Sequence, residues 1–344
     1  MIDSGELAWA CLFHFGTHMW GERPASVEKA KSGSLGGTCE HFRFDEEVWR
    51  RWTDAMANGG MNMVVMDIGE GLAYPSHPEL GIKGSWSADR LHDEVVRLRR
   101  LGLEPIPKLN FSSTHDTWLG DYSRMVSTAT YYNVCHDVLA DLVEIFEKPR
   151  FFHIGYDEET AIHQKRADMM IVRQGELWWH DLLWFERTIA DMGSRPWMWA
   201  DYIWWHRKEF VERMPKRVLQ SNWYYNSDKI DPRLHKGPVT REEIDNNWDQ
   251  RVWTAAFQWL EDAAFDQMPC GSNYETDCNF AAIVEWGRTH VPPERLKGFC
   301  MAPWILTLPP KLDKGLAAID IVRRARADFE AKGVAVKKGS TSNA

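Results

Sequence analysis

Short apolar runs of strand length alternate with amphipathic helical patterns along nearly the whole chain. The first run, residues 7–15, leads into Gly16 and Thr17 and is typical of a buried strand. Seven later runs have the same character. The eight predicted strands are residues 7–15, 61–66, 104–111, 151–155, 196–200, 218–222, 252–257 and 296–301.

A segment with helical spacing follows each of these runs. In residues 45–58, Val48, Trp52 and Met56 fall on one helical face, and Gly59-Gly60 marks the helix end. The other predicted helices are residues 87–101, 128–147, 175–191, 208–214, 240–249, 276–290 and 311–331.

Eight parallel strands joined by helices are what a closed barrel requires, so we predict an α/β fold of the (β/α)8 TIM-barrel type. A doubly wound open sheet is the main alternative, but no G-x-G-x-x-G motif follows the first strand. No linker divides the 344 residues, and barrels with long βα loops can reach this length. We therefore predict one barrel over residues 1–333 and a polar C-terminal tail over residues 334–344.

The charge balance argues against several classes of partner. The formal net charge is −9, so the chain lacks the overall basic surface that binds nucleic acid. No uninterrupted apolar run of about 18 residues is present, which argues against a membrane span. The N-terminus lacks the basic flank and cleavage site of a secretory leader. We expect a soluble protein, cytoplasmic, or periplasmic or secreted if a leader was removed.

Six widely spaced cysteines form no C-x-x-C pair, which argues against a zinc knuckle or a disulfide scaffold. Cys270 and Cys278 bracket a short loop and could pair in an oxidising compartment. Isolated buried thiols are the interpretation that we prefer.

Acidic and polar side chains follow several predicted strands, at the end where a (β/α)8 barrel holds its active site. The fourth strand leads into Asp157, Glu158 and Glu159. Two close carboxylates cannot easily both ionise, so we expect one of them to hold a proton, as a general acid must. A solvated acidic loop or the first turn of a helix is the alternative. The other polar residues at strand ends are Asp67, Glu70, Asn110, His115, Asp116 and Asp201.

The chain is rich in aromatic residues, with 19 Trp, 9 Tyr and 15 Phe, and these divide into two groups. Trp49, Trp52, Trp178, Trp179 and Trp184 lie on helical stripes and are predicted to pack against the barrel wall. A second group stands at strand ends, where aromatic faces beside carboxylates suit a sugar ring. This second group comprises Trp118, Trp199, Trp223, Tyr224, Tyr225, Trp259 and Trp304.

These segments resemble motifs of the catalytic barrel of the family 20 glycoside hydrolases, the β-N-acetylhexosaminidases. The segment HIGYDE at residues 153–158 resembles the family's H-x-G-G-D-E motif, with Tyr156 in place of the second glycine. The segments WAD at 199–201 and SNWY at 221–224 are similar to the W-x-E/D and S-x-W-Y elements. The region with Asn110 and His115 resembles the stretch leading into E-I-D-x-P-G-H, and GFCMAPW, ending at Trp304, resembles the strand-eight segment. The resemblance covers about residues 7–331.

The sequence departs from the family pattern at two residues that grip sugar hydroxyls. His14 and His18 stand where the family has an arginine after the first strand. Ile305 and Leu306 follow Trp304 where the family has a glutamate. The family's small α/β domain before the barrel has no counterpart in this sequence. These departures concern the identity of the sugar more than the class of reaction.

The resemblance implies a retaining glycosidase that acts on β-linked N-acetylglucosamine or N-acetylgalactosamine with help from the substrate's own 2-acetamido group. Glu158 would protonate the leaving oxygen and later activate water, and Asp157 would orient the acetamido group. Tyr224, or its neighbour Tyr225, would donate a hydrogen bond to the acetamide oxygen. No cofactor and no metal are implied. The predicted substrate-binding residues are His153, Asn110, His115, Asp67, Trp199, Asp201, Trp223, Tyr225, Trp259 and Trp304.

Two other functions stay open. A metal-dependent barrel hydrolase would use His14, His18 and His115 with Asp67 or Asp201, although no H-x-H or H-E-x-x-H motif is present. A non-catalytic sugar-binding barrel would keep the aromatic cleft without the hydroxyl-gripping residues. If a plain glycoside were cleaved instead of a 2-acetamido glycoside, Glu159 or Asp201 would be candidates for a separate nucleophile. The sugar configuration, exo or endo action and the oligomeric state stay open as well.

Overall fold

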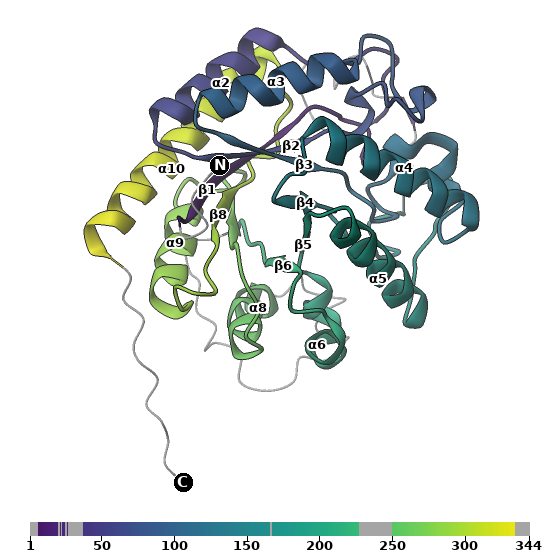
Figure 1. Ribbon diagram of the computed structural model, residues 1–344. Helices are drawn as coiled ribbons and strands as arrows, with labels where there is room; N and C mark the ends of the chain where they lie inside the picture. Colours follow the sequence, from purple (N-terminus) through teal and green to yellow (C-terminus); the bar gives the residue numbers. More distant parts are fainter. Residues whose placement is uncertain are drawn as a thin grey trace.

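A computed structural model describes residues 6–19, 21, 23–24, 26, 37–165, 167–226 and 250–333. Eight parallel strands form one sheet in the order β6-β5-β4-β3-β2-β1-β8-β7. In Figure 1 the strands surround a common centre and the helices form an outer ring. The strands are β1 (Ala8–His14), β2 (Met63–Asp67), β3 (Glu104–Lys108), β4 (Phe151–His153), β5 (Arg195–Trp199), β6 (Leu219–Ser221), β7 (Cys270–Gly271) and β8 (Gly298–Met301).

The two ends of this strand order, β6 and β7, meet and close the barrel. Parallel bridges join Gln220 to Gln267 and Trp223 to Cys270. The backbone N–H of Cys270 donates to the carbonyl of Asn222 at 2.9 Å. The predicted (β/α)8 barrel is therefore confirmed over the open sheet.

The helices alternate with the strands as predicted. They are α2 (Glu46–Asn58), α3 (Ala88–Arg100), α4 (Ala129–Ile145), α5 (Glu176–Asp191), α6 (Tyr202–Arg213), α8 (Gln250–Asp262), α9 (Asn279–His290) and α10 (Leu312–Lys332). Three of them begin with a side-chain cap, in which Asp45, Ser87 or Thr128 accepts a hydrogen bond from a backbone N–H of the first turn. Helix α10 packs against α2 and α9, so the last helix completes the ring beside the first (Figure 1).

The prediction of a strand at residues 252–257 is wrong, because these residues belong to helix α8. Trp253, Ala256, Phe257 and Leu260 are buried and recur at helical spacing. A short apolar run does not distinguish a buried helix segment from a buried strand. The true seventh strand, β7, has only two residues, which is too short for any periodic signal.

The other differences concern boundaries. Helix α6 begins at Tyr202, before the predicted start near residue 208. The helix predicted at residues 240–249 and the tail predicted at residues 334–344 lie outside the described residues.

Tryptophan side chains join the outer helices to the strands. Trp49, Trp52, Trp178 and Trp179 are buried, as predicted from their helical stripes, and Trp184 is half-buried against the same core. Phe13 of β1 stacks on Trp52 with ring centroids 4.4 Å apart. Full burial of a large apolar side chain contributes about 1.5–3 kcal/mol, so this packing is a major part of the stability of the barrel wall.

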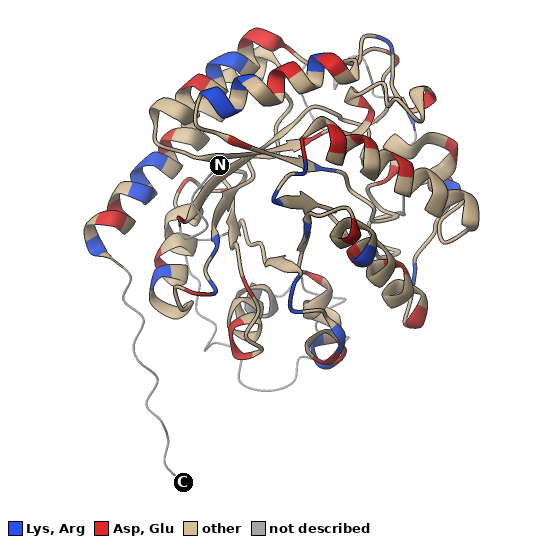
Figure 2. Cartoon of the chain, viewed as in Figure 1, with Lys and Arg blue, Asp and Glu red and all other residues tan. Residues whose placement is uncertain are grey.

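Charges of both signs are interspersed over the outer helices in Figure 2. No described helix is long and apolar enough to cross a membrane. All six cysteines are free, with Cys270 buried in β7 and Cys278 exposed.

Candidate active site

The chain turns sharply after β4 and places two carboxylates at the mouth of the barrel. Gly155, Tyr156 and Glu158 all have positive φ angles, of 66°, 73° and 56°. A non-glycine residue with a positive φ is uncommon, and such strain concentrates at functional sites. The Asp157 side chain is buried, whereas the Glu158 side chain is 22% exposed, so Glu158 reaches further toward solvent.

Asn110, two residues after β3, holds the Asp157 carboxylate. Its Nδ2 donates to Asp157 Oδ1 at 2.7 Å. Its Oδ1 accepts from the backbone N–H groups of Ser112 and Tyr156, at 3.0 and 3.1 Å. Asn110 was predicted to bind substrate, but its contacts are those of a residue that positions Asp157.

His115 lies between the two carboxylates. Its Nε2 is 3.4 Å from Asp157 Oδ2 and 3.3 Å from Glu158 Oε2. Burial alone would lower the pKa of His115, but the charges of Asp157 and Glu158 raise it to about 10. The imidazole therefore carries a proton at neutral pH and forms an ion pair with both acids.

The protonation of the carboxylates differs from the expectation for the Asp157–Glu158 pair. Burial would raise the pKa of Glu158, but contacts with His115 and His163 lower it well below its usual range. Asp201, two residues after β5, is the neighbouring carboxyl group whose pKa is raised instead. Burial and the charge of Asp157 raise the pKa of Asp201 to about 8. Asp201 Oδ2 also accepts the backbone N–H of Glu158 at 2.9 Å, so this residue supports the turn from below.

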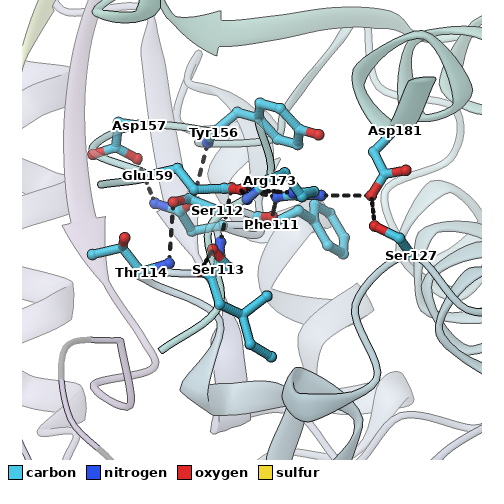
Figure 3. A network of polar contacts seen from close by, with 12 residues as sticks. Phe111, Ser112, Ser113, Thr114, Ser127, Tyr156, Asp157, Glu159, Arg173 and Asp181 are labelled. Atoms are coloured by element: carbon cyan, nitrogen blue, oxygen red, sulfur yellow. Dashed lines mark hydrogen bonds and ion pairs between the residues drawn. The ribbon is translucent and has the colours of Figure 1, made fainter. Parts of the chain in front are cut away.

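The third consecutive acid, Glu159, is bound by a buried arginine. Arg173 Nη2 is 2.6 Å from Glu159 Oε2, and Arg173 Nη1 is 3.1 Å from Asp181 Oδ2 on α5. Figure 3 shows Glu159 directed into this network, which also contains the carbonyl of Phe111 and the hydroxyl of Ser127. Glu159 is therefore occupied structurally, which argues against its use as a nucleophile.

Aromatic rings from three strand ends form one wall of the site. The Trp199 and Trp304 rings are 6.1 Å apart, and Tyr225 is 6.3 Å from Trp304. Trp223 stacks on Tyr225 at 5.1 Å. Trp304 is half-buried with a φ of 50°. These predicted aromatic residues are thus brought together, with Trp199 and Trp223 buried and Tyr225 and Trp304 partly exposed.

Three other predicted aromatic residues lie elsewhere. Tyr224 is buried, with its ring 6.2 Å from Trp253 of α8, whereas the charge of Asp157 contributes to raising the pKa of Tyr225. Trp259 does not end a strand as predicted but lies on α8 beneath the guanidinium of Arg207. Trp118 is buried and donates from Nε1 to the carbonyl of Asn110 at 2.8 Å.

Asp67 and two of the predicted histidines belong to a polar layer inside the barrel. His14, Asp67, Lys108 and His153 are register partners on β1 to β4 and are all buried. Lys108 Nζ is 2.6 Å from Asp67 Oδ2, and His14 Nδ1 is 3.3 Å from the same atom. Burial would raise the pKa of Asp67, but Lys108 and His14 lower it to about 2. Two rings of this layer contact the aromatic wall: His14 is 5.6 Å from Trp304 and His153 is 4.4 Å from Trp199, between ring centroids.

The predicted metal site is divided: His14 and Asp67 lie together in the polar layer, whereas His115 lies with Asp157 and Glu158. Among the described residues, one group has the ligand types and spacing to hold a metal ion, namely His115, Asp157 and Glu158, whose ligand atoms lie within 4.8 Å of one another. Its imidazole would first have to lose the proton that both acids stabilise. His18 instead accepts the backbone N–H of Cys39 at 2.7 Å, and His14 lies in the polar layer.

One residue of the site, His163, is absent from the sequence-based prediction. It lies in the loop after β4, and its Nε2 is 3.4 Å from Glu158 Oε1. It also lines a small polar pocket of about 40 Å³ together with Thr114, Asp116 and Gln164. The available signal was its position five residues after Glu158, although a lone loop histidine is weak evidence of a role.

No protein-family model matches the sequence, and no curated protein matches it. The fold, however, matches solved structures of family 20 enzymes. A β-N-acetylhexosaminidase from Bacteroides fragilis matches with a TM-score of 0.58 and 12% identity, over 96% of this chain and 72% of that chain. The GH20 β-N-acetylhexosaminidase of Streptomyces coelicolor A3(2) matches at 0.56 and 13%, over 98% and 72%. Dispersin B matches at 0.53 and 14%, over 83% and 96%. The predicted resemblance to this family is thus confirmed for the fold of the barrel.

Proposed function

We propose that this protein is a glycoside hydrolase that cleaves β-linked 2-acetamido sugars with retention, assisted by the substrate's acetamido group. One observation carries the proposal: the carboxylates of Asp157 and Glu158 lie close together at the end of β4, and the charge of Asp157 acts on Tyr225, whose ring is 6.3 Å from that of Trp304. The fold-similar solved proteins, which are named as β-N-acetylhexosaminidases, support the same class of substrate.

In this reaction Asp157 acts on the acetamido group. Asn110 donates to Oδ1 at 2.7 Å and His115 Nε2 lies 3.4 Å from Oδ2, so we expect the less tightly bound Oδ2 to accept the acetamide N–H. This contact orients the acetamide oxygen to attack the anomeric carbon, while the C–O bond to the leaving group breaks. The Asp157 charge stabilises the oxazolinium-like intermediate, and the Tyr225 hydroxyl donates to the acetamide oxygen.

Glu158 transfers the proton. It protonates the leaving oxygen in the first step and removes a proton from water in the second, so its proton balance closes over one cycle. In the free protein Glu158 is ionised, and the nearest proton lies on His115, 3.3 Å from Oε2. A bound sugar excludes water and disfavours separated charges, which favours transfer of this proton to Glu158.

A non-catalytic sugar-binding barrel is the second candidate. It is favoured by the low pKa of Glu158, because an ionised carboxylate paired with two imidazoles is a poor acid but a good partner for sugar hydroxyls.

A panel of aryl glycosides with and without the 2-acetamido group tests the proposal. We expect turnover of the 2-acetamido glycosides only, inhibition by a thiazoline analogue, and loss of about 10²- to 10⁴-fold in kcat for Glu158→Gln with unchanged folding. Asp157→Asn should lose most of its activity on the 2-acetamido substrates. Binding of N-acetylglucosamine by calorimetry without any release of reducing ends would favour the binding barrel. Near wild-type activity of Glu158→Gln would overturn the assignment.

A further inference from the structure

The loop after β4 brings a second imidazole to the proposed acid. Each Glu158 oxygen faces an imidazole at ion-pair distance: His115 Nε2 is 3.3 Å from Oε2, and His163 Nε2 is 3.4 Å from Oε1. His115 comes from the loop after β3, whereas His163 comes from the same loop as Glu158. The two contacts are therefore independent of each other.

Thr160 contacts both the backbone and the imidazole of His163. The Thr160 hydroxyl oxygen is 3.4 Å from the backbone N–H of His163 and 2.7 Å from its Nδ1. That oxygen accepts the backbone N–H and can direct its own hydrogen at Nδ1. The neutral imidazole then keeps its proton on Nε2, which faces Glu158.

We propose that Thr160 and His163 position the Glu158 carboxyl group: Thr160 selects the tautomer, and His163 donates from Nε2 to Oε1. Oε1 accepts this hydrogen bond whether Glu158 is protonated or ionised, because the proton that reaches the substrate is carried by the other oxygen. The contact holds the carboxyl in one orientation through both half-reactions. It also favours the ionised form, which suits the water-activating step. The catalytic consequence of this inference rests on the proposed function. The contact between His163 and Glu158 does not depend on that function.

Other charged groups also face the Glu158 carboxyl, and each of them must be unchanged in the variants that are compared. Glu158 also faces Asp157, His115 and Asp201. On its other side His163 faces the polar pocket that Asp116 and Arg124 line. None of these is changed in the variants below.

The experiment compares His163→Leu with His163→Gln, whose amide N–H can still donate to Oε1. One hydrogen bond is worth about 1 kcal/mol, or somewhat less than one pH unit. In His163→Leu we expect the pKa of the Glu158 carboxyl to move up by about half to one unit, because its ionised form loses a hydrogen-bond donor. The kcat at the optimum should fall about tenfold. His163→Gln and Thr160→Ser should stay near wild type, and Thr160→Val should shift in the same direction as His163→Leu.

A second readout needs no activity. Titration of carboxyl-¹³C-labelled protein by NMR, with the Glu158 signal assigned through Glu158→Gln, should show the same upward pKa shift in His163→Leu. The control is His136→Gln, on the exposed face of α4, which should change neither readout. An unchanged Glu158 titration in His163→Leu, or equal effects of His163→Leu and His163→Gln, would overturn the inference. If the wild-type protein cleaves no glycoside but His163→Leu still shows the Glu158 titration shift, the proposed function is refuted and the positioning contact is supported.

Discussion

At the scale of single residues, the structure distinguishes between two adjacent tyrosines, Tyr224 and Tyr225. The S-x-W-Y resemblance points to Tyr224, yet Tyr224 packs against α8, while Tyr225 lies in the wall with Trp304 and Trp223. Burial raises the pKa of Tyr225, and the charge of Asp157 adds to this increase. The residue that meets the acetamide oxygen is therefore expected to be Tyr225.

We predict that Tyr225→Phe lowers kcat on 2-acetamido glycosides by about 10²-fold, as removal of one oxyanion donor typically does. Tyr224→Phe, the matched control, should change kcat by less than about threefold, since a buried hydroxyl outside the site contributes mainly to stability. Steady-state kinetics of both variants measure the difference. A larger loss for Tyr224→Phe would return the role to the motif residue.

At the scale of elements, the strand-four turn depends on the absence of one side chain. A Cβ placed on Gly155 would lie 2.2 Å from Asn110 Oδ1, and the φ of Gly155 is 66°. The same asparagine holds Asp157. Close contact between the ends of β3 and β4 is thus what places the carboxylate.

Gly155→Ala should destabilise the protein by about 2–5 kcal/mol, combining backbone strain with overpacking. The control is Gly102→Ala, where φ is 81° and no atom lies within 4 Å of the added Cβ. That variant carries only the strain, about 1–2 kcal/mol. Urea denaturation followed by tryptophan fluorescence compares them. Equal losses of unfolding free energy in the two variants would mean that Asn110 moves away from the added methyl group at no cost.

At the scale of the whole molecule, the polar groups enclosed by the closed barrel make stability depend on pH. Burial raises the pKa of both Asp116 and Asp201 to about 8, whereas an unfolded aspartate titrates near about 3.9. Between these values the folded protein holds protons that the unfolded chain has released. Stability is therefore greatest below about pH 4 for these two groups and falls as the pH rises toward 8.

We predict that Asp116→Asn flattens this decline, because the amide stays neutral at every pH. Each pKa unit corresponds to about 1.4 kcal/mol, so the wild type should lose several kcal/mol more than the variant between pH 5 and pH 8. Unfolding in urea at both pH values measures the difference. Asp121→Asn, an exposed change in the same loop, is the control. A decline as steep in Asp116→Asn as in the wild type would contradict the prediction.

Local spacing in the sequence was enough to predict the (β/α)8 class, β1 to β6 and β8, and the packing role of Trp49 and Trp52. Periodicity within one segment reports which face is buried, and it needs no knowledge of distant residues. The same spacing placed Asp157 and Glu158 at a strand end. It failed at residues 252–257 because a short apolar run is compatible with either a helix or a strand.

The partners of the carboxylates depended on the closed barrel. Asn110 and His115 reach Asp157 and Glu158 from the loop after β3. Arg173 and His163 contact Glu159 and Glu158 from further along the loop after β4. The choice of Tyr225 over Tyr224 and the proton on Asp201 have the same origin. Charges and hydrogen bonds act through space, so protonation at this site is determined only when barrel closure brings separate strand ends within a few ångströms of one another.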